Sequence, residues 1–266
     1  MSHLLDHIED NHGKRQADIV LSIIRRIMNW FATRDDDYVS CVVKGMKRAN
    51  GNGGRARILD DDEIRALWIA CESMGQFGAY CRTLLLTGQR RTKVATMRWD
   101  DLVDGAWHIR SDEREKDHAG ILKLPKVVLD IIEAQPRIAN NPFVFAGNPR
   151  GRRKPGPAAF NGYSEGKKQL DAKLPDMPPW VLHDLRRTAR SLMSRARVTS
   201  EHAERVLGHA IVGVEGIYNR HDFAQEKAVA LAKLAALVAK IVNPPAGDNV
   251  VTLAGRGSRG RKRRTA

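Results

Sequence analysis

The spacing of apolar residues along the chain predicts a mostly helical protein. Between residues 17 and 33, isoleucine, leucine, methionine and phenylalanine recur with a helical period, and Arg25 and Arg26 stand between them. The same period returns in the second half of the chain. Helices are expected at residues 17–33, 40–47, 80–86, 91–97, 126–134, near 167–170, and at 182–195, 201–207 and 223–242.

Two short runs interrupt this helical pattern and predict strands. Trp107–Arg110 and Ile121–Leu124 are rich in apolar residues and flank a charged turn, as in a β-hairpin. Pro125 then stands where proline favours the first turn of a helix. The expected fold class is therefore mainly α with a small antiparallel β-sheet (α+β).

An acidic run, Asp60-Asp61-Asp62-Glu63, has two interpretations. Four neighbouring carboxylates could bind a metal. The run also comes directly before the apolar residues Ile64, Leu67 and Trp68, where acidic side chains commonly cap the N-terminus of a helix. The helix cap is the favoured interpretation.

Composition divides the chain into four segments. A polar, glycine-rich stretch at residues 48–55 is typical of a linker. We expect a short helical module at 1–50, a linker at 51–58, a larger domain at 59–243 and a basic disordered tail at 244–266. About 50 residues are few for an independent domain, so the first segment resembles part of a larger helical module.

The charge balance points to a polyanionic partner. The chain has 45 Lys and Arg against 31 Asp and Glu, a net charge of +14. Such a surplus suits nucleic acid, because each phosphate that is neutralised releases a condensed counterion. Charge alone does not separate an enzyme from a ribosomal or simply basic protein. Three cysteines without CxxC spacing, no long apolar run and no signal peptide favour the cytoplasm, near the nucleoid and away from membranes.

Four stretches supply the parts needed to break a DNA phosphodiester. Arginine can clamp phosphate oxygens, a nucleophile must be activated, and an acid must protonate the departing oxygen. The stretches are Thr87-Gly-Gln-Arg90, the turn Glu113-Arg-Glu-Lys116-Asp-His118, His183-Asp-Leu-Arg186, and Leu207-Gly-His209 followed by Tyr218. A lone His-x-x-Arg is frequent by chance, but this ordered set is specific.

In this order, the four stretches resemble the catalytic domain of the tyrosine recombinases, the phage-integrase family. The resemblance covers about residues 59–227. It implies transesterification without a cofactor or metal, in which Tyr218 attacks a scissile phosphate and forms a 3′-phosphotyrosyl link. Arg90 and Arg186 would hold the phosphate, and His183 and His209 would donate to it. His183 could also help take the tyrosine proton, and Lys116 would protonate the leaving oxygen.

The resemblance also implies partners. The family acts on double-stranded DNA as a tetramer, and an accessory DNA-bending or excision factor is possible. We expect further basic residues to contact DNA: Arg91, Arg187, Arg220, and Arg152, Arg153 and Lys154 in the long basic loop at 146–180. The first 50 residues resemble, less specifically, the end of the family's core-binding module.

One residue departs from the family pattern. Members usually carry an acid three positions after the first catalytic arginine, where this chain has Lys93. Lysine cannot accept a hydrogen bond, so Asp100 or Asp184 would have to hold Arg90, or the site is weakened. On this basis Lys93→Glu should leave cleavage unchanged or improve it. A non-catalytic DNA-binding relic and a type IB topoisomerase-like enzyme are the alternatives to a recombinase.

Overall fold

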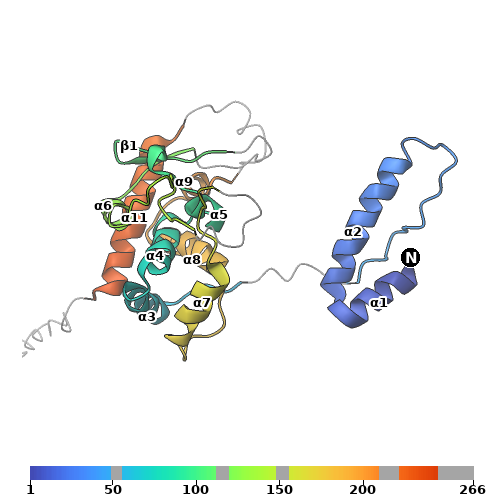
Figure 1. Ribbon diagram of the computed structural model, residues 1–266, viewed down its shortest axis with the longest axis horizontal. Helices are drawn as coiled ribbons and strands as arrows, with labels where there is room; N and C mark the ends of the chain where they lie inside the picture. The colour runs from blue at the N-terminus through green and yellow to red at the C-terminus, as the bar shows by residue number, and fades with distance from the viewer. Residues whose placement is uncertain (49–55, 112–119, 148–155, 210–221, 245–266) are drawn as a thin grey trace, which may run out of the picture. The chain divides into compact units, whose positions relative to one another are not determined.

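A computed structural model of the chain describes residues 1–48, 56–111, 120–147, 156–209 and 222–244, which form two compact units (Figure 1). The units are Met1–Ala56 and Arg57–Ala266. Several predicted residues lie outside the described ones: Lys116, the basic residues 152–154, Tyr218, Arg220 and residues 245–266 of the expected tail.

The first unit is built on two helices, α1 (Ser2–His12) and α2 (Lys14–Phe31), which pack against each other. Their shared core consists of Leu5, Ala17 and Leu21. The helix expected at 17–33 is therefore confirmed, although it begins three residues earlier, whereas the sequence analysis did not predict α1.

The helix expected at residues 40–47 is wrong. The chain there forms bends and turns, and Val42 and Met46 pack in this form against the core of α1 and α2. Two local features oppose a helix. The Ser40 hydroxyl accepts a hydrogen bond from the Val42 N–H at 3.1 Å, which competes with helical bonding. Gly45 has φ 95°, a left-handed conformation that a helix does not contain.

The second unit surrounds a buried central helix, α4. This helix contacts α3, α5, α6, α8 and α11, and ten of its thirteen residues are buried, as expected for a helix that is covered on all sides. The elements of this unit are α3 (Asp61–Glu72), α4 (Gly75–Thr87), α5 (Arg91–Ala95), the 3₁₀ turn η1 (Trp99–Asp101), β1 (Leu102–Val103), β2 (Ala106–His108), β3 (Ile121–Lys123), α6 (Lys126–Glu133), α7 (Tyr163–Ala172), α8 (Leu182–Arg195), α9 (Ser200–Leu207) and α11 (Ala224–Val242).

The acidic run at 60–63 is a helix cap, as predicted. The Asp60 carboxylate accepts the Glu63 N–H at 2.9 Å, and the Glu63 carboxylate accepts the Asp60 N–H at 2.9 Å. Each side chain thus satisfies a backbone donor that the first turn of α3 would leave unpaired.

The three strands form an antiparallel sheet in the order β1-β2-β3. Trp107 pairs with Leu122, and both side chains are buried, so this register turns one face of the sheet to the core. β1 is an addition to the two strands expected from the sequence. Its signal is Asp104-Gly105, which joins β1 to β2 with positive φ at both residues and is typical of a two-residue hairpin turn.

The predicted fold class, mainly α with a small antiparallel sheet, is confirmed. The helix expected at residues 91–97 is present but shorter, since α5 covers only Arg91–Ala95. Within the described residues, no helix combines the length and the apolar character needed to span a membrane.

Gly78 permits α3 and α4 to approach closely. A Cβ at this position would lie 1.9 Å from the Cys71 backbone oxygen, far inside van der Waals contact, so a helix must shift. We expect Gly78→Ala to lower the free energy of unfolding by about 2 kcal/mol, although alanine usually favours a helix. Urea denaturation measures the change. Gly162→Ala is the control, because its Cβ would meet Phe160 at an ordinary 3.4 Å; equal stability of the two variants would contradict the prediction.

Candidate active site

Arg186 on α8 is the centre of the predicted site. Its side chain is buried, with 5% exposed. Nη1 donates to the Gly88 carbonyl at 2.7 Å, Nη2 donates to the Leu207 carbonyl at 3.0 Å, and Nη2 lies 2.7 Å from His209 Nε2. One guanidinium therefore joins three of the stretches that the sequence analysis singled out: Thr-Gly-x-Arg, His-x-x-Arg and Leu-Gly-His.

The backbone conformation explains why glycine stands at positions 88 and 208 of these stretches. Gly88 ends α4 with φ 63° and Gly208 ends α9 with φ 71°, left-handed conformations in which glycine is favoured. Space is also limited, since a Cβ at Gly88 would lie 2.9 Å from Leu207 Cδ2. The glycines end both helices beside Arg186, so that carbonyl oxygens face its guanidinium.

Arg90 lies close enough to Arg186 for their charges to interact. Burial first, and then the charge of Arg90, lower the pKa of Arg186 to about 10, while Glu204 acts in the opposite direction. Arg186 remains charged at neutral pH. Two like charges held together beside a buried position are unfavourable on their own, and an anion bound between them would relieve the repulsion.

His183, on the first turn of α8, is exposed. Partial burial, followed by the charges of Arg187, Arg186 and Arg90, lowers its pKa below 6.5, against the opposite effect of Asp184. The imidazole is therefore neutral at pH 7, the form that can accept a proton.

A cavity of about 480 Å³ opens beside these residues. It is lined by Arg90 and His183 and by residues of α5, of α7 and of the segment that leads into α8 and the start of that helix: Arg91, Thr92, Tyr163, Ser164, Lys167, Trp180, Val181 and Leu182. The Arg91 guanidinium lies 5.2 Å from the centre of the Tyr163 ring, and the Lys167 ammonium lies 4.2 Å from that of Trp180. Positive charge and aromatic faces thus adjoin the two candidate catalytic residues.

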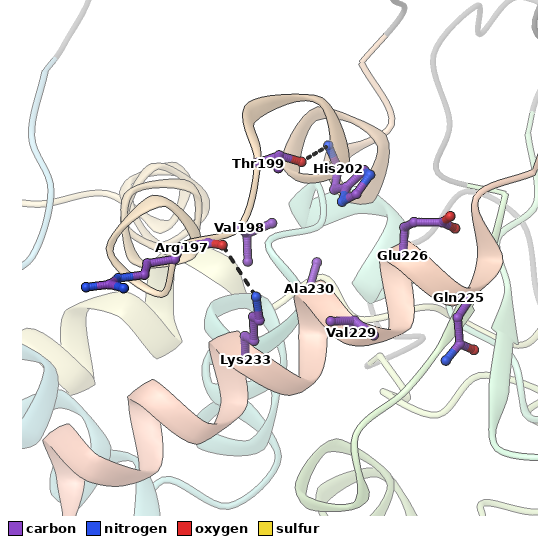
Figure 2. Close-up of a pocket in the computed structure, with 9 residues that line it drawn as sticks. All are labelled: Arg197, Val198, Thr199, His202, Gln225, Glu226, Val229, Ala230 and Lys233. Carbon is purple, nitrogen blue, oxygen red and sulfur yellow. Dashed lines mark hydrogen bonds between the residues drawn. The ribbon is translucent and has the colours of Figure 1, made fainter.

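A different cavity, of about 300 Å³, lies between α9, α11 and the turn that precedes α9 (Figure 2). Figure 2 shows Lys233 Nζ donating to the Arg197 carbonyl, at 3.4 Å, and the Thr199 hydroxyl accepting the His202 N–H, at 3.3 Å. Of the predicted catalytic residues that the structure describes, Arg90, His183, Arg186 and His209, none lines this cavity.

The remaining predicted site residues fall into two groups. Arg91 is exposed at the cavity with Arg90, and Arg187 donates to the buried Asp184 carboxylate at 2.6 Å. Asp184 also accepts the Val181 N–H at 2.9 Å, so this acid helps to cap α8. The others lie outside the described residues: Lys116, Tyr218, Arg152, Arg153, Lys154 and Arg220.

Lys93, at the position that is usually acidic, has a definite contact. Its ammonium donates to the Arg110 carbonyl at 2.6 Å, just beyond the end of β2. The side chain of Arg110 in turn donates to Asp101, which is buried. Lys93 thus connects the helix that begins after Arg90 to the end of the strand that leads toward residues 112–119.

The structure adds one acid that the sequence analysis did not single out, Glu204 on α9. Its carboxylate accepts a hydrogen bond from Arg190 Nε at 2.7 Å and contacts His209 Nδ1 through its other oxygen. The available signal was its position five residues before His209. A helix that ends with glycine in this way brings those two positions together.

The match to a known family covers more than half of the chain. Residues 57–225 match the model of the Phage integrase family. The chain belongs to the phage integrase family. The Prophage integrase IntF of Escherichia coli (strain K12) is 24% identical to this chain over an alignment of 158 residues, and the match covers 57% of this chain and 32% of IntF. The chain thus spans about a third of the length of that relative.

Solved structures share the fold of this chain at low sequence identity. A lambda integrase (75–356) dimer bound to a COC′ core site matches with a TM-score of 0.60 and 17% identity, over 79% of this chain and 77% of that chain. The Tn1549 transposon integrase (aa 82–397), in complex with circular intermediate DNA, matches with a TM-score of 0.56 and 14% identity, over 83% and 80%. These matches confirm the expected tyrosine-recombinase fold.

Proposed function

We propose that this integrase is a site-specific DNA recombinase that cuts and rejoins DNA through a 3′-phosphotyrosyl intermediate, and so integrates or excises a mobile element. The observation that carries the proposal is the position of Arg186, whose guanidinium joins three motif stretches around one point. Family membership and the charge of +14 support DNA as the substrate.

Arg186 retains donors for a phosphate. A guanidinium has five N–H donors. Contacts to Gly88, Leu207 and His209 use three of those on Arg186, so within the described residues one donor on Nε and one on Nη1 remain. Arg90 supplies a second guanidinium beside it. Two such groups can hold the non-bridging oxygens, which gain charge in the transition state.

The covalent step then needs proton transfers at two atoms. The Tyr218 oxygen would attack phosphorus and lose its proton to His183, whose depressed pKa keeps the ring neutral. The bond from phosphorus to the 5′-oxygen would break, and Lys116 would protonate that oxygen. Reversal of these steps with a different 5′-hydroxyl rejoins the DNA, since the phosphotyrosyl link conserves the bond. A free tyrosine is only about 0.1% ionised at pH 7, so a base is needed.

The proposed partners follow from the same site and from the family. Double-stranded DNA would lie across the cavity at Arg90, Arg91 and Lys167. A lambda integrase tetramer bound to a Holliday junction shares this fold, with a TM-score of 0.59, 16% identity, and coverage of 78% of this chain and 62% of that chain. We propose that this integrase also works as a homotetramer on DNA, with or without an accessory DNA-bending factor.

A nicked suicide substrate tests the activity. When the nick lies next to the scissile phosphate, the cleaved fragment diffuses away and a covalent protein–DNA adduct accumulates. We expect an adduct with the wild-type protein and none with Tyr218→Phe. Tight, salt-sensitive binding without an adduct would instead support a DNA-binding relic. Relaxation of a plasmid that lacks a recombination site would support a topoisomerase.

A further inference from the structure

The carboxylate of Glu204 joins α9 to α8 and to His209. One oxygen accepts a hydrogen bond from Arg190 Nε at 2.7 Å, and the other contacts His209 Nδ1. Partial burial alone would raise the pKa of Glu204, but the hydrogen bonds from Arg190 and His209 outweigh it and lower the pKa below 4.5. Glu204 is therefore ionised at neutral pH and acts only as an acceptor.

The backbone keeps Glu204 and His209 together. The His209 N–H donates to the Glu204 carbonyl at 3.0 Å, and the Gly208 N–H donates to the Arg205 carbonyl at 3.2 Å. This pair of bonds around a left-handed glycine is the Schellman motif. These backbone bonds bring position 204 close to position 209, and Arg190 on α8 also holds the Glu204 carboxylate.

The hydrogen bonds on the two ring nitrogens fix the tautomer of His209. Arg186 Nη2 lies 2.7 Å from Nε2, and a guanidinium can only donate, so Nε2 is the acceptor. The ring proton is then on Nδ1, where the ionised Glu204 accepts it. A proton on Nε2 would instead point at the guanidinium.

We propose that Glu204 is a positioning residue for Arg186, because it fixes His209 in the tautomer whose Nε2 holds the guanidinium. The inference rests on the proposed function, in which Arg186 binds the scissile phosphate. It also changes the expected role of His209 in the DNA-free protein. There the imidazole accepts from Arg186 rather than presenting a proton to the phosphate.

Single-turnover cleavage tests the kinetic consequence. We expect Glu204→Ala to slow adduct formation on the suicide substrate about tenfold, the effect of losing a hydrogen bond to a charged group, while the Kd for DNA changes less than about twofold. Glu201→Ala is the matched control. Glu201 lies one turn earlier on α9 and pairs only with Arg205 in the contacts described, at 3.0 Å, so its loss removes the same charge without affecting His209.

A double-variant cycle separates this role from a purely structural one. If Glu204 acts through His209, the variant that combines Glu204→Ala with His209→Ala cleaves no more slowly than His209→Ala alone. Multiplicative losses in the double variant would overturn the proposal. A loss of cleavage in Glu201→Ala equal to that in Glu204→Ala would also overturn it.

Nitrogen-15 NMR of the DNA-free protein tests the tautomer directly. At neutral pH we expect His209 to show a protonated Nδ1 and an unprotonated Nε2, and we expect this pattern to be lost in Glu204→Ala and kept in Glu201→Ala. The His209 signals are assigned by their absence in His209→Ala. An unchanged pattern in Glu204→Ala would overturn the proposal. Because this measurement needs no DNA cleavage, its result stands even if the wild-type protein forms no adduct and the proposed function fails.

Discussion

Arg186→Lys is expected to reduce formation of the covalent DNA adduct at least about a hundredfold, comparable to the loss of a preorganised donor to a developing oxyanion. An ammonium has three donors on one atom and cannot reach the Gly88 carbonyl, the Leu207 carbonyl and a phosphate together. The same change leaves buried carbonyl groups unpaired, so the melting temperature should also fall. Single-turnover cleavage and thermal denaturation measure the two effects.

Arg195→Lys is the control for this variant. Arg195 lies at the last residue of the same helix and pairs with Asp61 at 2.5 Å on the surface, with about half of its side chain exposed. Surface ion pairs of this kind contribute little, so cleavage should stay near the wild-type rate. Wild-type cleavage by a folded Arg186→Lys variant would remove the basis of the proposed site.

Lys93→Glu is expected to slow cleavage about tenfold, contrary to the expectation from sequence alone. A carboxylate at this position could pair with Arg90, but both positions are partly open to solvent, where an ion pair contributes at most about 1 kcal/mol. The variant loses the charged hydrogen bond to the Arg110 carbonyl, which at a solvent-exposed site is worth about 1.5 kcal/mol, the lower end for bonds to charged groups. It also places a carboxylate oxygen beside the Arg110 carbonyl oxygen. The loss is therefore expected to dominate.

Two control variants test whether the loss of cleavage comes from the lost Lys93 hydrogen bond. Lys93→Arg keeps a donor near the Arg110 carbonyl and should cleave within about threefold of wild type, since a retained hydrogen bond leaves little net change. Lys126→Glu reverses a charge on the exposed side of α6, where the lysine contacts Asp130 at 2.6 Å, and should leave cleavage unchanged. Cleavage by Lys93→Glu at or above the wild-type rate would restore the interpretation from sequence.

Local signals predicted much of the fold. The acidic cap of α3, the apolar period of α8 and the glycine break after Thr87 each have their cause within a few residues. The prediction failed at residues 40–47, where packing of Val42 and Met46 on α1 and α2 outweighed a weak helical pattern. It missed β1 because a strand of two residues has little pattern of its own, although Asp104-Gly105 marked the turn.

The candidate site could be predicted only in part. Residue types and their order pointed to Arg90, His183, Arg186 and His209, and the structure brings parts of these stretches together at Arg186. The contacts that support them could not be predicted in the same way. The Lys93 bond joins residues 17 apart in the chain, and no local pattern specifies such a pair. Glu204 could have been predicted from the sequence. The glycine after α9 indicates a helix end that brings position 204 close to His209.

The partners of Arg186 have a consequence for the response of the site to acid. The guanidinium meets the C-terminal ends of two helices, the Gly88 carbonyl after α4 and the Leu207 carbonyl at the end of α9. Helix C-termini carry partial negative charge from aligned peptide dipoles, and a peptide dipole does not titrate. An arginine anchored by a carboxylate loses its counter-charge when that acid is protonated. The carbonyl contacts that anchor Arg186 are therefore retained in acid for as long as α4 and α9 remain folded.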